Sequence, residues 1–158
     1  VYDGGDFWHI VGFGLSELFE KQSENQEVSG YGLEFTFKLL KAGCNDEQQE
    51  IKTVISIMQD LARLTFEEGE IFLPFEYIYT GQQHGFDSEE QSQLTGFITV
   101  PEPKLESLQT PFGKLIFVEL VGATDAELQA IMQGQLRVRE LYARLGTDVT
   151  DLQRGSLV

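Results

Sequence analysis

Residues 31–40, YGLEFTFKLL, alternate between apolar residues and polar or small ones. The apolar positions, which share one face of an extended chain, are Tyr31, Leu33, Phe35, Phe37 and Leu39. The other face carries Gly32, Glu34, Thr36 and Lys38. A period of two with many aromatic residues predicts a β-strand that buries one of its faces.

The period changes to that of a helix over residues 51–66. The apolar residues of this segment recur three or four positions apart, at Ile51, Val54, Ile55, Met58, Leu61, Ala62 and Phe66. Charged residues mostly fill the opposite side, so the spacing predicts an amphipathic helix whose apolar stripe faces the core. Gly69 follows as a natural stop, because glycine readily adopts the left-handed conformation that ends helices.

Strand-like segments follow this helix. Residues 71–81, IFLPFEYIYTG, are rich in aromatic and branched side chains, but Pro74 places their first half at a sheet edge or a bulge. The polar residues 82–93 predict a loop, and LTGFITV at 94–100 predicts a strand that ends at the two prolines of residues 101–103.

A turn at residues 109–113, QTPFG, introduces the longest apolar run of the second half of the chain. This run, KLIFVELVG at 114–122, predicts a central strand, and Glu119 is its one exception. Thr124 and Glu127 then have the spacing of a capping box, which predicts a helix that begins at residue 125.

The end of the chain predicts a second short helix followed by a strand. Gly134 interrupts the first helix, and a new helical stripe follows at Val138, Leu141, Tyr142 and Leu145. Residues 147–158 predict a short strand and a turn. Strands and helices mix without regular βαβ alternation, so we expect one α+β domain over residues 1–158, with a mixed β-sheet flanked by α-helices.

Composition narrows the range of partners. The 158 residues include 26 Asp or Glu and 11 Lys or Arg, a net charge of −15, which is unsuited to nucleic acid and favours a basic or neutral partner. No apolar run is long enough to span a membrane. The single cysteine, Cys44, excludes an intrachain disulfide and favours a reducing, cytoplasmic location. Because the sequence begins at Val1 rather than Met, a processed or trimmed N-terminus is also expected.

Candidate catalytic chemistry is sparse. His9 lies in an apolar segment, where a histidine is usually packed with its nitrogens hydrogen-bonded. His84 and Asp87 are close enough in the sequence to orient each other, which keeps a hydrolase open, but no G-x-S-x-G motif supplies a nucleophile. The histidines, Cys44 and the carboxylates show no zinc or calcium spacing. We therefore expect no catalytic residues, no bound metal and no cofactor.

Four sequence blocks, in order along the chain, resemble the suppressor of fused family. They are FWHIVGFGLSELFE at 7–20, SGYGLEFTFKL at 29–39, QTPFGKLIFVELVGATDAEL at 109–128 and TDLQRGSLV at 150–158. The signature residues carried over by this resemblance are Trp8, His9, Gly30, Gly32, Glu34, Thr110, Pro111, Phe112, Gly113, Arg154 and Gly155. The family is not known for catalysis, so the resemblance implies that Trp8 and His9 serve the architecture.

The resemblance also implies a function in protein binding. Animal members are regulators that hold a short peptide of a Gli-type transcription factor as an added strand between two domains, and this chain resembles only the N-terminal one. Single-domain members resemble a bacterial set, some of which accompany secreted toxins and are thought to be immunity proteins. We expect either a toxin-neutralising immunity protein or a regulatory adaptor that binds an endogenous peptide by strand addition, with a hydrolase as the remaining alternative.

The sequence places the binding surface around the loop at residues 80–93 and the strands that flank it. This segment follows an edge-like strand and combines aromatic residues with carboxylates, and both features are common at binding sites. The candidate binding residues are Tyr77, Tyr79, His84, Phe86 and Asp87. The partner is expected to be a protein or peptide, neither nucleic acid nor membrane.

Overall fold

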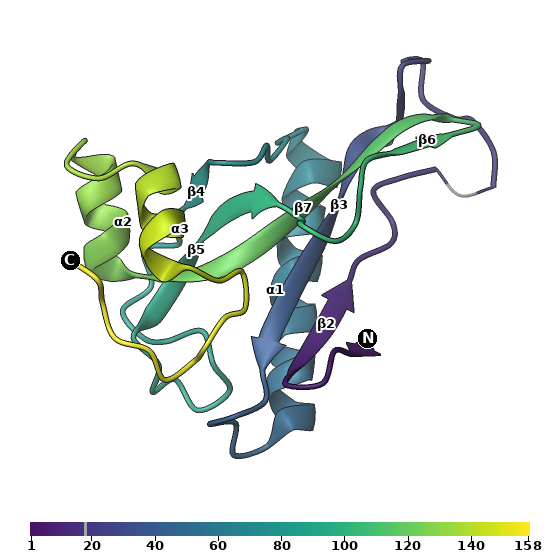
Figure 1. Cartoon of the computed structure of the whole chain (residues 1–158). Coiled ribbons are helices and arrows are strands. Elements are labelled where there is room, and N and C mark those ends of the chain that lie inside the picture. Colours follow the sequence, from purple (N-terminus) through teal and green to yellow (C-terminus); the bar gives the residue numbers. More distant parts are fainter. Residues whose placement is uncertain (18) are drawn as a thin grey trace.

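The computed structural model describes residues 1–17 and 19–158. These residues form a seven-stranded sheet and three helices (Figure 1). The strands are β1 (Tyr2–Asp3), β2 (Phe7–Val11), β3 (Val28–Leu40), β4 (Tyr77–Ile78), β5 (Leu94–Pro101), β6 (Leu108–Thr110) and β7 (Gly113–Thr124). The helices are α1 (Glu47–Glu68), α2 (Asp125–Met132) and α3 (Val138–Leu145). The predicted α+β class, a mixed sheet flanked by helices in a single domain, is confirmed.

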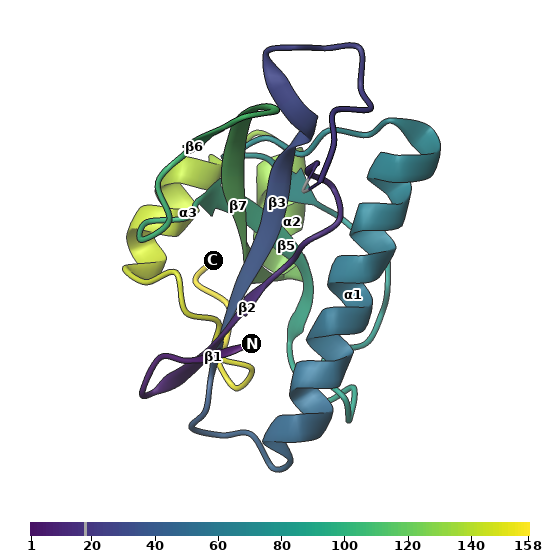
Figure 2. The same ribbon diagram turned by 90° about the vertical axis from the view of Figure 1, so that its right-hand side faces the viewer.

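The two longest strands lie side by side in the middle of the sheet. The strand order is β1-β2-β3-β7-β5-β4, and β6 pairs with β7 outside that path. β3 and β7 are parallel, whereas the other pairs are antiparallel. The chain between β3 and β7 contains α1, which packs on one face of the sheet, while α3 lies on the other face (Figure 2). The predicted central strand and the turn before it are thus confirmed.

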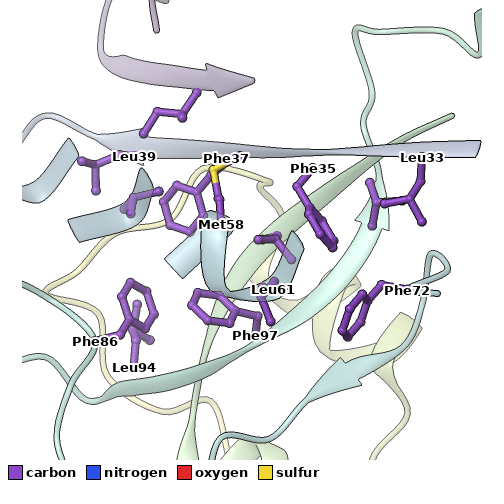
Figure 3. Close-up of a cluster of buried hydrophobic side chains, with 14 of the residues drawn as sticks. Leu33, Phe35, Phe37, Leu39, Met58, Leu61, Phe72, Phe86, Leu94 and Phe97 are labelled. Atoms are coloured by element: carbon purple, nitrogen blue, oxygen red, sulfur yellow. The ribbon is translucent and has the colours of Figure 1, made fainter. Parts of the chain in front are cut away.

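The face of the sheet beneath α1 carries the larger apolar core (Figure 3). Its buried side chains include Leu33, Phe35, Phe37 and Leu39 of β3, Val54, Met58 and Leu61 of α1, and Phe72, Phe86, Leu94 and Phe97. The Phe37 ring lies edge-on to the rings of Phe86 and Phe97, with centroids 6.3 Å away in both cases. The alternation predicted for β3 therefore places its apolar residues correctly.

The opposite face of β3 differs from the prediction, because it is also buried. Glu34, Thr36 and Lys38 are exposed by only 2%, 0% and 1%, respectively. β3 has strands on both sides, and segments that follow α3 and β5 supply partners for its second face. Polar side chains are tolerated there because they hydrogen-bond to one another or to the backbone.

Both ends of α1 and the start of α2 carry residues whose chemistry suits those positions. The Asp46 side chain accepts a hydrogen bond from Gln49 N at the start of α1, and Gly69 ends the helix in the left-handed conformation with φ of 73°. At α2, Thr124 Oγ1 accepts from Glu127 N at 3.3 Å, and Thr124 N donates to Glu127 Oε2 at 2.9 Å. The predicted stop at Gly69 and the predicted capping box are confirmed.

Two predictions at the ends of elements are wrong. Phe66 belongs to the predicted apolar stripe of α1, yet its side chain is 70% exposed, because Thr65 takes the buried position of the last turn. The Phe66 ring instead lies edge-on to Tyr31 at 6.4 Å. The strand predicted after α3 is reduced to an isolated parallel bridge between Leu39 and Thr150.

Among the described residues, none of the helices combines the length and the apolarity that a membrane crossing requires.

Candidate protein-binding surface

β4 is the last strand of the sheet at one end. It pairs with β5 through Tyr77 with Ile98 and Ile78 with Phe97, and no described strand pairs with its other side. Thr99 N donates to the Glu76 carbonyl across the pair. Hydrogen-bonding residues alternate along an antiparallel ladder, so Tyr77, the next residue, directs its N–H and C=O away from β5. An open backbone edge is thus available at this end of the sheet.

Large apolar side chains are exposed along this edge. Tyr77 and Tyr79 are 43% and 38% exposed, and Ile71 and Leu73 in the segment before β4 are 40% and 50% exposed. Tyr79 is partly anchored, because its hydroxyl accepts from Gln129 Nε2 of α2 at 3.2 Å. The sequence identified the two tyrosines but overlooked Ile71 and Leu73, whose exposure depends on the irregular path around Pro74. The open side of β4 and the four exposed side chains beside it form what we call the β4 edge surface. These side chains are Ile71, Leu73, Tyr77 and Tyr79.

The predicted residues of the loop after β4 do not all belong to this surface. His84 is exposed, but Phe86 is only 7% exposed and stacks on Phe97 at 4.7 Å between centroids, so its prediction as an exposed aromatic residue is wrong. Asp87 stabilises its own turn, because its carboxylate accepts from Gln91 N at 3.1 Å and from Ser92 N at 2.8 Å. Phe86 enters the core because it fills the space beside Phe37, a contact that local sequence does not encode.

The His84–Asp87 pair considered for a hydrolase is not assembled. Within the described part of the chain, no hydrogen bond or ion pair joins the His84 imidazole to Asp87. The Asp87 carboxylate is already engaged by backbone amides, so it does not orient a base.

Glu34, a signature residue, anchors the loop that follows β2. Its Oε1 accepts from the backbone N–H groups of Gly14, Leu15 and Ser16 at 2.8–3.0 Å and from Ser16 Oγ at 2.6 Å. Gly30 passes close to the same loop, because a Cβ at this position would lie 2.3 Å from the Leu15 carbonyl oxygen. Gly30 has a φ of 58°, which also favours glycine.

Of the three other signature glycines, two have a positive φ and one faces open space. Gly32 has a φ of 78° and lies close to the Val28 side chain. Gly113 has a φ of 119°, and a Cβ there would lie 2.5 Å from the Val28 carbonyl carbon. At Gly155, by contrast, a Cβ would meet only Gln93 Oε1 at 4.0 Å, so nothing steric requires glycine.

The other signature residues serve turns and packing. Thr110 Oγ1 donates to the Gly113 carbonyl at 2.8 Å and accepts from Phe112 N at 3.1 Å, which closes the turn around Pro111. The guanidinium of Arg154 donates to both carboxylate oxygens of Glu127, each at 2.7 Å, and so ties the end of the chain to the start of α2. These contacts serve the architecture of the fold.

The Trp8–His9 pair has two different environments. Trp8 Nε1 donates to Glu47 Oε2 at 2.6 Å, and Lys41 Nζ lies 4.1 Å from the centre of the indole. His9 is packed as predicted, but its buried Nε2 has no hydrogen-bond partner among the described residues, so the expectation of two satisfied nitrogens is wrong. The nearest carboxylate oxygen, Glu102 Oε1, is 3.9 Å away. Burial and the nearby Lys38 ammonium lower the pKa of His9.

Lys38 is the centre of a buried charged cluster on the second face of the sheet. Its ammonium donates to Glu102 Oε1 and Asp148 Oδ2 and lies 3.6 Å from Glu119 Oε2. Burial alone would lower the pKa of Lys38, but the bonds to Asp148 and Glu102 outweigh it, so the pKa is raised. Burial raises the pKa of Glu119 to about 8, although Thr36 donates to its Oε2 at 2.6 Å.

The same cluster contains the one metal-like arrangement found in residues 1–17 and 19–158. His9, Glu102 and Glu119 each offer a ligand atom, and these atoms lie within 4.8 Å of one another. Their positions in the sequence give no recognisable spacing, so sequence analysis missed the grouping. The Lys38 ammonium already supplies a cation to Glu102 and lies 3.6 Å from Glu119 Oε2. The cluster is therefore better described as a buried ion-pair network.

Comparisons with known proteins agree with the sequence blocks. The family model for "Suppressor of fused protein (SUFU)" matches residues 2–155. The suppressor of fused homologs of Homo sapiens and Mus musculus are each 26% identical over 164 residues, which cover 97% of this chain and 33% of theirs. The chain thus spans about a third of the length of these relatives.

Solved structures share the fold. The crystal structure of a Sufu–Fu complex matches with a TM-score of 0.78 and 24% identity, over 95% of this chain and 69% of that one. The crystal structure of Drosophila Suppressor of Fused matches with a TM-score of 0.77 and 24% identity, over 95% of this chain and 38% of that one. With a family match over nearly its whole length, this chain belongs to the suppressor of fused family.

Proposed function

We propose that this chain is a non-catalytic protein-binding module that takes a peptide segment of its partner as an added strand along β4. The observation that carries the proposal is the open side of β4, where Tyr77 directs its backbone N–H and C=O away from the sheet. A peptide strand would pair with these groups, and the exposed side chains of the β4 edge surface would contact alternate peptide side chains.

The other end of the sheet is less suited to strand addition. β1 is a two-residue strand like β4, but Asp3 within it forms an ion pair with Lys41 at 2.6 Å. Charged side chains on edge strands discourage pairing with other chains, whereas the four side chains of the β4 edge surface are uncharged. Aromatic residues contribute strongly to binding when a partner covers them.

The partner in this proposal is a basic or neutral protein. The chain has a net charge of −15, and a complementary basic partner would associate faster than a neutral one. The Sufu–Fu complex, formed by a protein of the same fold, supports a protein partner. A toxin-neutralising immunity protein fits a basic target, and a regulatory adaptor for an endogenous peptide is the alternative. Both roles use the same surface and fit a cytoplasmic location.

A binding experiment with a backbone-specific variant tests the strand addition. Peptides are selected from a displayed random library against the chain and then titrated against Tyr77→Pro, Tyr77→Ala and Leu108→Ala. Proline removes the outward N–H of Tyr77 but none of the hydrogen bonds to β5, so it should weaken binding about thirtyfold or more with little loss of stability. Tyr77→Ala should weaken binding less. Leu108, which is 49% exposed on β6, serves as the control and should have no effect.

Unchanged affinity of the selected peptides for Tyr77→Pro would contradict strand addition at β4. The immunity role has a separate test, in which the chain is coexpressed with a toxin that it binds. Restored growth of the toxin-producing cells would support immunity, whereas binding without protection would favour the adaptor.

A further inference from the structure

A hollow of ≈ 300 Å³ lies where the chain leaves β2, between residues 12–15, β3 and α1. Most of its wall is apolar and is formed by Ile10, Leu15, Phe35, Ile55, Met58 and Ala62. Its volume reaches the lower end of the range typical of small-molecule sites, about 300–1,000 Å³. Neither strand addition nor the buried cluster around Lys38 uses this hollow.

Among the described residues that line this hollow, Glu34 has the one charged side chain, and the N-terminal residue Val1 also contributes to the wall. The residue is 2% exposed, and its two oxygens have different surroundings. Oε1 receives the four hydrogen bonds from residues 14–16. Oε2 accepts no hydrogen bond from the described residues and lies beside Gly12, 3.7 Å from where a Cβ of that residue would be. Among the described residues, one acceptor oxygen in the wall thus has no hydrogen-bond partner.

We propose that this hollow binds a small organic cation, with an ammonium group against Glu34 Oε2 and an apolar alkyl or aryl body against the α1 side of the wall. A buried carboxylate has lost much of its hydration, so a donor that reaches its free oxygen restores a hydrogen bond that water supplied in the unfolded chain. A positively charged donor gains more than a neutral one, because hydrogen bonds to charged groups are the stronger class.

The walls explain why the ligand needs an apolar body. A bare ammonium ion would leave the surfaces of Phe35, Met58 and Ala62 wet. An aryl or alkyl group of moderate size removes these surfaces from water, and each buried methylene contributes about 0.8 kcal/mol. The combination selects amphipathic amines over inorganic cations and over neutral arenes.

The experiment uses 2-phenylethylammonium as the probe and 2-phenylethanol as its neutral counterpart, each titrated into the labelled chain by amide-resolved NMR. The amine should shift amides of residues 10–15, 34–35 and 58–62 and should bind about tenfold or more tightly than the alcohol.

Two variants and one control locate the interaction. Glu34→Gln keeps an acceptor for the loop amides but removes the charge, so it should weaken the amine about tenfold or more and leave the alcohol nearly unchanged. Ala62→Leu should weaken both probes, because it fills the hollow from α1. Glu106→Gln removes the same charge from an exposed position outside the hollow and should change neither affinity.

Three outcomes would overturn the proposal. They are the absence of localised shifts at millimolar amine, equal affinity of the wild-type chain for amine and alcohol, and equal affinity of Glu34→Gln and wild type for the amine. Should Glu34→Gln fail to fold, as judged by its melting curve, the amine–alcohol comparison on wild type and Ala62→Leu still decides the matter. None of these readouts depends on a peptide at β4.

Discussion

The two faces of β3 are equally buried but are stabilised by different chemistry. The face beneath α1 presents Phe35 and Phe37, whose contacts with other rings and aliphatic chains are apolar and weakly directional. The opposite face presents Thr36 and Lys38, which are buried just as completely and rely on Glu119, Glu102 and Asp148. Burial in this protein is thus not restricted to apolar residues.

The difference matters for how each face responds to change. An apolar side chain contributes in proportion to the surface it removes from water and to the cavity that its removal leaves. A buried charge contributes little by itself, because its desolvation offsets the attraction of its partners. Loss of one partner, however, leaves the other charge buried and uncompensated. The apolar face should therefore respond residue by residue, and the polar face as a network.

The largest effect is expected on the apolar face. Phe37→Ala should lower the free energy of unfolding by about 3–5 kcal/mol, because Phe37 is 1% exposed and its removal leaves a cavity beside Phe86 and Phe97. Urea unfolding measures this loss. Phe66→Ala is the matched control, since Phe66 is 70% exposed and should cost far less. Similar losses for both variants would refute the assignment of this face as the core.

A comparable loss, again about 3–5 kcal/mol, is expected for Lys38→Met, because methionine keeps the volume but leaves buried carboxylates without their cation. The informative step is the second substitution. Adding Glu102→Gln to Lys38→Met should recover part of the stability, since the uncompensated charge is removed. Chemical denaturation of the wild type, both single variants and the double variant gives the coupling free energy between Lys38 and Glu102. Strictly additive losses would show that the polar face is not a network.

The sequence predicted most of the apolar face because its information is local. The alternation of β3, the stripe of α1 and the capping box of α2 each depend on residues a few positions apart. The edge position of β4 was also predictable, because Pro74 restricts pairing nearby. Phe66 shows the limit of such patterns, since it continues the predicted spacing but Thr65 takes the buried position of the last turn.

The polar face was not predictable because its partners are distant in the sequence. Lys38 bonds to Glu102 and Asp148, which are 64 and 110 residues away. A lysine in an alternating strand ordinarily indicates a solvated face, and only the unexpected Glu119 within an apolar run signalled otherwise. The same limit applies to the candidate site: Tyr77 and Tyr79 were predicted at the edge, but the burial of Phe86 depends on Phe37 and Phe97.

Glu119→Gln is expected to change the free energy of unfolding by a few kcal/mol, and the size of this change should depend on pH. The pKa of Glu119 is raised to about 8 in the folded chain, above its ordinary 4.5, so the folded state binds the proton more tightly than the unfolded state. The contribution of this proton to the free energy of unfolding is fully present below about pH 4.5 and is lost as the pH rises through about 8. Glutamine does not titrate, so the variant should gain stability relative to wild type from pH 5 to pH 8.

The difference in unfolding free energy between Glu119→Gln and wild type, measured at several pH values, checks this sign. The wild-type chain also contains Glu102 and Glu127, whose pKa values are lowered and whose contributions to stability therefore rise with pH. Only the difference between variant and wild type isolates the contribution of Glu119. A difference that does not change with pH would mean that Glu119 is ionised or solvated in the folded state.

The smallest effect concerns the helix that covers part of the second face. Thr124 Oγ1 caps α2 through a 3.3 Å bond from Glu127 N, while Glu127 is held independently by Arg154. Thr124→Ala should therefore cost about 0.5–2 kcal/mol. Thr124→Ser keeps the accepting oxygen and loses only a methyl group, so it should cost less than alanine, and a reversible thermal melt can rank the two. Equal losses for alanine and serine would assign the contribution of Thr124 to its buried methyl group. In that case even this polar position would be stabilised in the manner of the apolar face, and the distinction between the two faces would begin only at the charged cluster around Lys38.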